Sequence, residues 1–350
     1  MLLASGCLQV VSDEPGSYLP DCSLGAASPG VTTLYPGVLS QSMAPSDDPA
    51  GLALGADCSL YVADSTEIRR VDPAGNVTTV VASSTTPTDD INAINPGWLA
   101  IDATGNLYIA DPSNDRICKL DRRGNLTTLA GNGQPGFADG TGGPNGSSSF
   151  NNPVAVAVDP DGNVYVADST NSRIRRIDTS GNVTTFAGNG KYGPQDGTAG
   201  PTGSAEFFGP AGVAVDGIGN VYVADTLNQR ICKIDSSGNV TTLAGGAGAR
   251  AGGYQDGTGG PAGAARFSGP TGLAAQWDGT VYVADTGNRR IRRIDGAGNV
   301  TTLAGGQSQS MDGTLGPTGT AGFFELSELI LDGNGNLYAN DDDAVRKVVP

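Results

Sequence analysis

The feature that most constrains this chain is an internal repeat with a period of about 55 residues. The tetrapeptide Tyr-Val-Ala-Asp and its close variants start at Tyr61, Tyr108, Tyr165, Tyr222, Tyr282 and Tyr338. A second motif, Val-Thr-Thr-Leu and its relatives, starts at Val31, Val77, Leu126, Val183, Val240 and Val300. Repetition at a nearly fixed period indicates units that each bury an apolar face against a neighbour. Both motifs occur six times, so the chain contains six units.

Each unit resolves into four short segments with the patterns of β-strands. In the third unit these segments, separated by polar and glycine-containing turns, are residues 154–158, 164–167, 173–177 and 183–186. Four antiparallel strands per unit, with no helical period between units, are typical of the blade of a β-propeller. An array of β-sandwiches offers no reason for one four-strand unit to recur six times. The sequence therefore predicts an all-β fold, a six-bladed β-propeller of four-stranded antiparallel blades.

The order of the motifs predicts how the ring closes. The first segment of the Val-Thr-Thr-Leu type, residues 31–34, precedes the first Tyr-Val-Ala-Asp motif, and none follows residues 345–348. An N-terminal strand at residues 31–34 would complete the last blade and remove a bare sheet edge. We expect residues 31–350 to form the propeller, closed by this strand, and residues 1–30 to form an N-terminal segment and tether.

Composition excludes several classes of function. Histidine is absent from all 350 residues, which excludes Ser-His-Asp and Cys-His nucleophile systems and every zinc site that needs histidine. The formal net charge is −16, with 20 Lys and Arg against 36 Asp and Glu. Nucleic-acid binding depends on clustered basic residues that release counterions from phosphates, so we expect no nucleic-acid partner. The sequence predicts no cofactor and no metal site.

Four segments of the repeat match a known pattern. They are Gly-Pro-Ala-Gly-Val-Ala-Val-Asp at 209–216, Gly-Asn-Val-Tyr-Val-Ala-Asp-Thr at 219–226, Asn-Arg-Arg-Ile-Arg-Arg-Ile-Asp at 288–295 and Gly-Asn-Val-Thr-Thr-Leu-Ala-Gly at 298–305. Together they resemble the NHL repeat in its long bacterial form, over about residues 31–350. The resemblance implies a six-bladed propeller that serves mostly as a binding platform, although some related propellers are lactonases or lyases. The histidine that gives the family its name is replaced here by Ser172, Gln229 and Arg289.

Four connections between units are long and share a motif. Each contains Asp-Gly-Thr and then a phenylalanine, at Asp139 and Phe150, Asp196 and Phe207, Asp256 and Phe267, and Asp312 and Phe323. We interpret each Phe as an apolar peg that holds the connection to its blade, and each Asp-Gly-Thr as an Asp-capped turn. A repeated calcium site is the alternative, because carboxylate and carbonyl oxygens suit that ion. Insertions within repeats often mark a binding face, so we expect these connections to form the top, binding face.

Two groups of residues are candidates for partner binding. The first lies near the tips of the long connections, where aromatic residues and Met are favoured in interfaces, and comprises Phe137, Tyr192, Tyr254 and Met311. The alternative is that these side chains fold back onto their own loops. The second is an acidic turn that could hold a cation or a basic partner, or be simply solvated, and comprises Asp341, Asp342 and Asp343.

The turn between the second and third strands of the middle units has its own pattern. An Asp precedes an Arg by five residues in the pairs Asp111 and Arg116, Asp168 and Arg173, Asp225 and Arg230, and Asp285 and Arg290. An Asn lies between them in each case, at Asn114, Asn171, Asn228 and Asn288. We interpret this pattern as a hydrogen-bonded turn network, and a ring of functional carboxylates around the pore as the alternative.

The five cysteines and the N-terminal residues are informative about the cellular compartment in which the protein is located. Leu3-Ala4-Ser5-Gly6-Cys7 resembles a bacterial lipobox, whose Cys7 would be lipidated, although few residues precede it. The alternative is a frayed apolar terminus. We propose a disulfide between Cys22 and Cys58, near the closure of the ring, and expect Cys118 and Cys232 to be unpaired because their blades are not neighbours.

These observations favour a non-enzymatic, extracytoplasmic binding scaffold, secreted or lipid-anchored at a bacterial surface. Its partner would be a protein or a glycan, bound by the loop-rich top face. The protein would associate with a membrane only through a lipid anchor. One alternative is an enzyme like the propeller lactonases and lyases, with a metal held by carboxylates and Asn in the central pore. Another is a structural subunit that self-assembles into a surface assembly or fibre.

Overall fold

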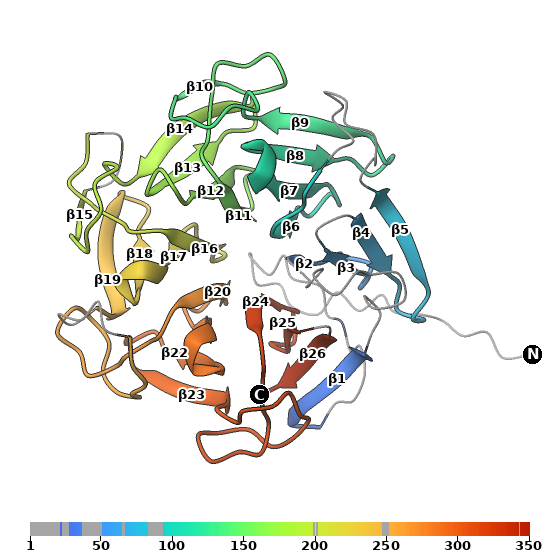
Figure 1. Cartoon of the computed structure of the whole chain (residues 1–350), viewed down its shortest axis with the longest axis vertical. Coiled ribbons are helices and arrows are strands. Elements are labelled where there is room, and N and C mark those ends of the chain that lie inside the picture. Colours follow the sequence, from blue (N-terminus) through green and yellow to red (C-terminus); the bar gives the residue numbers. More distant parts are fainter. Residues whose placement is uncertain are drawn as a thin grey trace, which may run out of the picture.

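The chain folds as six antiparallel sheets arranged in a ring, as Figure 1 shows. The computed structural model describes residues 22, 28–36, 51–64, 67–82, 94–198, 200, 202–246, 252–342 and 344–350. The six-bladed propeller predicted from the repeat is confirmed. Within these residues, helix is confined to three short 3₁₀ turns, η1 (Pro112–Asn114), η2 (Thr226–Asn228) and η3 (Thr286–Asn288).

Each blade contains four strands that run in order from the centre to the circumference. Blade 1 consists of β2 (Gly51–Leu54), β3 (Leu60–Ala63), β4 (Glu67–Val71) and β5 (Val77–Ala82). Blade 2 consists of β6 (Leu99–Ile101), β7 (Leu107–Asp111), β8 (Arg116–Leu120) and β9 (Leu126–Ala130). Blade 3 consists of β11 (Pro153–Val158), β12 (Val164–Asp168), β13 (Arg173–Ile177) and β14 (Asn182–Ala187).

The remaining blades follow the same plan. Blade 4 consists of β16 (Pro210–Val215), β17 (Val221–Asp225), β18 (Arg230–Ile234) and β19 (Asn239–Gly245). Blade 5 consists of β20 (Pro270–Ala275), β21 (Val281–Asp285), β22 (Arg290–Ile294) and β23 (Val300–Gly305). Blade 6 consists of β24 (Leu326–Leu331), β25 (Leu337–Asp341), β26 (Ala344–Val349) and β1 (Gly30–Pro36).

The turn between the first two strands shows why the repeat folds locally as it does. In blade 3 the Asp159 carboxylate accepts hydrogen bonds from the backbone N–H and the Nδ2 of Asn163, both at 2.8 Å. Between them Gly162 has a φ of 85°, which an L side chain rarely adopts. These side-chain bonds add to the backbone hydrogen bonds of the turn, from Asp159 N–H to the Asn163 carbonyl at 3.0 Å and from Gly162 N–H to the Asp159 carbonyl at 2.9 Å. The Asp-x-x-Gly-Asn pattern of the sequence is therefore a turn signal.

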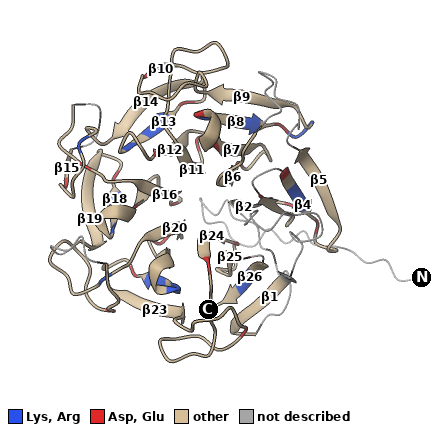
Figure 2. Cartoon of the chain, viewed as in Figure 1, with Lys and Arg blue, Asp and Glu red and all other residues tan. Residues whose placement is uncertain are grey.

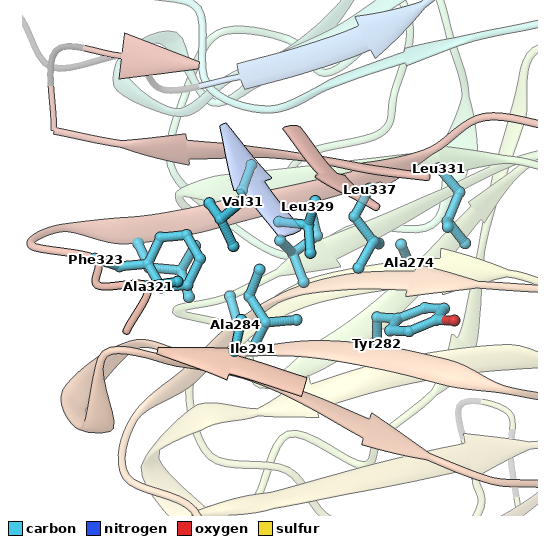
Figure 3. Packing of buried hydrophobic residues seen from close by; sticks show 14 residues of the cluster. Val31, Ala274, Tyr282, Ala284, Ile291, Ala321, Phe323, Leu329, Leu331 and Leu337 are labelled. Carbon is cyan, nitrogen blue, oxygen red and sulfur yellow. The ribbon is translucent and has the colours of Figure 1, made fainter. Parts of the chain in front are cut away.

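The hydrophobic core is divided into six clusters, and each lies between two neighbouring blades. Figure 3 shows the cluster between blades 5 and 6, where Val31, Leu329 and Phe323 lie near Ile291 and Ala284 of blade 5. All five side chains are at most 2% exposed. Full burial of a large apolar side chain contributes about 1.5–3 kcal/mol, so each blade is stabilised mainly by its neighbours.

Strand β1 lies at the outer edge of blade 6, beside the last strand of the chain. It is antiparallel to β26, with Val31 opposite Val348 and Thr33 opposite Arg346. On its other side, the backbone of Val31 forms two hydrogen bonds with Gly313, at 2.9 and 3.1 Å. The N-terminal and C-terminal strands of the ring are thus joined within one sheet.

The long connections extend along the circumference rather than standing over the centre. In the connection before blade 3, β10 (Gly140–Thr141) pairs with β14, and before blade 4, β15 (Gly197–Thr198) pairs with β19. Figure 1 shows both short strands outside the sheets they extend. These added strands, which the sequence did not predict, cover the outer edge of a blade, where unpaired backbone groups would otherwise be exposed. Among the described residues, no helix has the length and apolar character needed to cross a membrane.

Candidate functional site

Blades 3 to 6 each contain a buried arginine held between two aspartates. In blade 3, Arg175 is 2.9 Å from Asp168 of β12 and 2.7 Å from Asp139 of the long connection. The equivalent sets are Arg230 with Asp225 and Asp196, Arg292 with Asp285 and Asp256, and Arg346 with Asp341 and Asp312. Each set joins the connection to the blade, so we call it the Asp–Arg–Asp latch.

The latch explains the Asp-Gly-Thr motif. One oxygen of Asp256 accepts from Arg292 and from Thr302 Oγ1, and the other accepts from the Thr302 backbone N–H. The Asp196 carboxylate accepts the equivalent hydrogen bonds from Arg230 and Thr242. Carboxylate oxygens that are committed to arginine and threonine are poor calcium ligands. These contacts support the interpretation of the motif as a structural turn.

The predicted Asp–Asn–Arg turn network is confirmed only in part. The Asn side chain donates to the Asp carboxylate in all four middle blades, as Asn171 does to Asp168 at 2.9 Å. The Arg five residues after the Asp is its partner in blades 2 and 4. In blades 3 and 5 the partner is instead the arginine seven residues after, Arg175 or Arg292.

The strand period explains this difference. Residues two apart in a strand lie on the same face, so both arginine positions face the same Asp. In blades 2 and 4 the second position holds Cys118 or Cys232, and the first arginine takes its place. The alternation of Cys and Arg at this position was a signal that the sequence contained and that our interpretation missed. Both cysteines are buried and unpaired, as expected, and burial raises the pKa of the Cys118 thiol to about 12.

The four phenylalanines of the long connections are confirmed as buried pegs, because each is at most 1% exposed. They are Phe150, Phe207, Phe267 and Phe323. In three blades the latch arginine also lies over the ring of its peg, at 5.2 Å for Arg175 over Phe150. The peg and the latch therefore hold the same loop.

The four tip residues proposed for partner binding are accessible, with exposed fractions between 41% and 61%. Phe137 lies under Arg173, and Tyr254 lies under Arg290, each with 3.8 Å between the guanidinium carbon and the ring centre. Tyr192 contacts Phe208, with ring centres 5.2 Å apart. Met311 is bonded to Gly322 through its backbone. One side of each aromatic ring is thus seated on the propeller while part of it faces solvent, and their role in binding stays a prediction.

The acidic turn of blade 6 needs a correction. Asp341 is fully buried, and its carboxylate pairs with Arg346 at 2.8 Å and accepts from the backbone N–H of Phe324 at 2.6 Å. It is the latch aspartate of this blade, so it is unavailable to a partner, and the interpretation as a solvated turn is also wrong for it. Asp342 is partly exposed, with a φ of 57°. Asp343 lies outside the described residues.

The predicted disulfide is present. Cys22 and Cys58 are bonded, with their Cα atoms 5.3 Å apart, and the bridge ties the N-terminal part of the chain to the first turn of blade 1. Tyr338 of blade 6 donates from its hydroxyl to the Cys22 carbonyl at 3.2 Å. The bridge therefore lies where blades 6 and 1 meet. Cys7, the candidate lipidation site, lies outside the described residues.

The central pore contains a cavity of about 580 Å³, whose lining residues the sequence analysis did not predict. Its walls are the innermost strands of all six blades, and its lining includes both tryptophans of the chain, Trp98 and Trp277. It also includes Glu328 of β24, which is 4% exposed. Burial raises the pKa of Glu328 well above its usual range, opposed only by hydrogen bonds from the backbone N–H groups of Leu52 and Leu99.

The alternative enzyme hypothesis expected carboxylates and Asn in the central pore to hold a metal. Within the part of the chain that the structure describes, no three Asp, Glu, His or Cys side chains come together as metal ligands. The aspartates at the cavity mouth are committed to their own turns. Asp216, for example, accepts from Asn220 and from the hydroxyl of Tyr222. The described residues of the cavity therefore offer the Glu328 carboxyl group, two tryptophans and aliphatic walls, but no group of three Asp, Glu, His or Cys side chains.

Comparison with known proteins points to one family. Residues 46–196 match the model described as the teneurin NHL domain, and residues 267–294 match the NHL repeat. Teneurin-3 of Danio rerio is 29% identical over 286 residues, which are 74% of this chain and 10% of the teneurin. The Arabidopsis thaliana protein SUPPRESSOR OF QUENCHING 1, chloroplastic, is 31% identical over 274 residues, 71% of this chain and 25% of that protein. The chain thus spans a small part of the length of these relatives.

Solved structures of low identity share the fold. An auxiliary nutrient binding protein from Bacteroides thetaiotaomicron has a TM-score of 0.62 at 18% identity, covering 92% of this chain and 76% of its own. A streptogramin B lyase has a TM-score of 0.59 at 14% identity, covering 91% and 97%. Such identities show the fold alone, and both binding proteins and enzymes use it. Six blades built on one repeat, together with the matches to both NHL models, show that the chain belongs to the NHL-repeat family of β-propellers.

Proposed function

We propose that this propeller is a non-catalytic scaffold that binds a protein or glycan at the cell surface through the tips of its long connections. The observation that carries the proposal is the seating of the tip aromatics. Phe137 and Tyr254 occupy corresponding places in different blades and are each stacked on arginine while remaining partly exposed. An aromatic ring that is already held in place loses little conformational entropy on binding, which favours affinity.

The loop tips are distributed unevenly around the ring. They belong to the connections before blades 3 to 6, whereas the connections of blades 1 and 2 lack the motif. A partner would therefore contact one arc of the ring. Asp342, partly exposed at blade 6, lies at one end of that arc, and we include it in the proposed surface.

Two further observations support a binding role outside the cytoplasm. Disulfides persist in oxidising compartments, and Cys22 is bonded to Cys58. The structural neighbour from Bacteroides thetaiotaomicron is called an auxiliary nutrient binding protein. Anchoring through a lipid on Cys7 is part of the proposal, and mass spectrometry of the protein from its native membrane tests it.

Binding of the purified, fluorescently labelled chain to intact producing cells and to an array of surface polysaccharides tests the proposed function. We expect a variant that combines Phe137→Ala, Tyr192→Ala, Tyr254→Ala and Met311→Ala to lose most of the bound signal. The matched control is Val77→Ala, which removes an exposed apolar side chain from blade 1, where no long motif-bearing connection lies. Unchanged binding by the four-residue variant would contradict the proposal.

A further inference from the structure

The central cavity has the size and the walls of a site for a small molecule. Its volume of about 580 Å³ falls within the range of about 300–1,000 Å³ found for ligand pockets. Apolar side chains of the innermost strands line it, at Leu52, Leu99, Val156, Val213, Leu273 and Leu329. The long connections at the circumference are not among its lining residues, so this cavity is independent of the surface proposed above.

An exposed tryptophan stands at the cavity, where the repeat does not require one. Trp277 lies in the turn after β20 and is 65% exposed. The corresponding turn positions of the other blades hold small residues or proline, at Ala56, Ala103, Pro160, Gly217 and Gly333. Single exposed apolar side chains are common on proteins, so it is the place of Trp277 in the lining of the cavity that distinguishes it. The face of a tryptophan also attracts cations more strongly than that of any other side chain.

Glu328 is a second departure from the repeat. Its place in the register, one residue before Leu329, corresponds to Gly212 and Gly272 in blades 4 and 5. The Glu328 carboxyl group accepts backbone hydrogen bonds from Leu52 of blade 1 and Leu99 of blade 2. It therefore extends from blade 6 to the innermost strands of two other blades. None of the ion pairs among the described residues involves Glu328. A buried carboxyl group without a cationic partner is costly, and such groups gather at functional sites.

The charge of the cavity is of one sign. Its lining residues include no Lys or Arg, and Figure 2 shows no blue on the innermost strands, whereas the third strands carry most of the basic residues. Asp102, Asp159, Asp216 and Asp332 add negative charge at the turns, although their oxygens serve those turns. A low-dielectric cavity lined by one sign of charge concentrates ligands of the other sign.

We propose that the central cavity binds a small organic cation, an ammonium group attached to an apolar body. Glu328 receives the ammonium, the aliphatic walls enclose the body, and Trp277 covers the site from its mouth. This ligand class fits better than a metal ion, because the described residues gather no set of three metal ligands. It also fits better than an anion or a neutral apolar molecule, because only a cation compensates the Glu328 carboxylate.

Intrinsic fluorescence tests the proposal directly, because both tryptophans of the chain line the cavity. The probes are hexylammonium, hexanol and hexanoate, which share one apolar chain and differ in charge. We expect saturable change of the fluorescence with hexylammonium and at least about tenfold weaker binding of hexanol and hexanoate, since a charge-assisted hydrogen bond is lost. Equal binding of the three probes, or none by hexylammonium, would overturn the proposal.

Two variants assign the roles of the residues. Glu328→Gln keeps the size and the hydrogen-bond acceptor, so it should remove the preference for hexylammonium over hexanol while the fold, checked by circular dichroism, is retained. Trp277→Ala, at an exposed position that the fold does not use, should weaken hexylammonium binding severalfold when followed by calorimetry. Retention of full affinity in either variant contradicts the assignment. Calcium chloride is the competing probe, and displacement of hexylammonium by micromolar calcium would show a metal site instead.

The matched control separates this proposal from the proposed function. Phe137→Ala lies on a long connection and should leave hexylammonium binding unchanged, whereas Glu328→Gln should leave binding to cells unchanged. Loss of hexylammonium binding in Phe137→Ala would show that the two sites are coupled and contradict an independent cavity.

Discussion

The circumference and the centre of the propeller use charge in opposite ways. At the circumference, every latch arginine of blades 3 to 6 has two carboxylate partners, and the pattern is repeated with the same geometry. At the centre, Glu328 occurs once and has backbone donors only among its described contacts. The charges of the repeated latch residues are balanced by ion pairs, whereas Glu328, which breaks the repeat, is in none of the ion pairs among the described residues. The difference suggests where a repeat protein carries structure and where it carries function.

The largest expected effect comes from breaking a latch. Arg292→Ala leaves Asp285 and Asp256 without their partner, and Asp285 is fully buried. Removal of one member of a buried ion pair costs about 3–5 kcal/mol, so the free energy of unfolding in urea should fall by that amount. Arg293→Ala is the control, because Arg293 is partly exposed and its hydrogen bond to Thr280 is long, at 3.5 Å. A loss from Arg292→Ala no larger than that of the control would mean that the latch adds nothing.

The disulfide, which lies where blades 6 and 1 meet, is expected to give the next largest contribution to stability. Cys22 and Cys58 are 36 residues apart, and a bridge of that span stabilises by about 3–4 kcal/mol through the unfolded chain. Cys22→Ser with Cys58→Ser should lower the melting temperature, as should dithiothreitol on the original protein. Reductant should have no further effect on the double variant, and a further drop would point to damage elsewhere.

Glu328→Gln tests the centre of the propeller. Near pH 8 it should raise the free energy of unfolding by an amount on the order of 1 kcal/mol, whereas Arg292→Ala and loss of the disulfide lower it. Burial raises the pKa of Glu328 in the folded protein, so the protonated acid is favoured by folding and its contribution to stability is lost as the pH rises. The glutamine does not titrate. The variant should therefore equal the original protein near pH 4 and be more stable near pH 8 in urea unfolding. A variant that is less stable at pH 8 would show that the carboxylate is compensated.

The smallest effect on stability is expected at the loop tips. Tyr254→Ala removes the stack on Arg290 and the 3.1 Å hydrogen bond to Thr302, with a cost of about 0.5–1 kcal/mol at this partly exposed site. A tip that serves a partner should lose much more in binding than in stability. A loss of several kcal/mol in thermal unfolding would instead make Tyr254 part of the latch.

Much of the fold could be read from the repeat, because six copies of one pattern average out the ambiguity of a short strand. The four strands of blade 3 lie within one residue of their expected ends. The peg phenylalanines and the disulfide were also predicted, since their positions follow from the repeat and from the closure. The course of the long connections was not, because their pairing with the next blade depends on contacts more than 30 residues apart, such as Asp256 with Arg292.

The candidate sites also include residues that the sequence could predict and residues that it could not. The tip residues of the connections could be named from the sequence because insertions stand out against a repeat. Asp341 was misread, since a run of three acidic residues does not reveal that its first member is buried beside Arg346. Glu328 and Trp277 could have been found as the residues that break the pattern at matched positions, but only an alignment in register makes the positions match.

The sequence alone determined the number of blades, the strands within each and the exclusion of histidine chemistry, because these depend on local pattern and composition. The tertiary structure alone decided which aspartate meets which arginine and which carboxyl group is left over at the centre. The reason is physical. Strand formation is governed by neighbours in the chain, whereas burial and charge compensation are governed by groups brought together only when the ring closes.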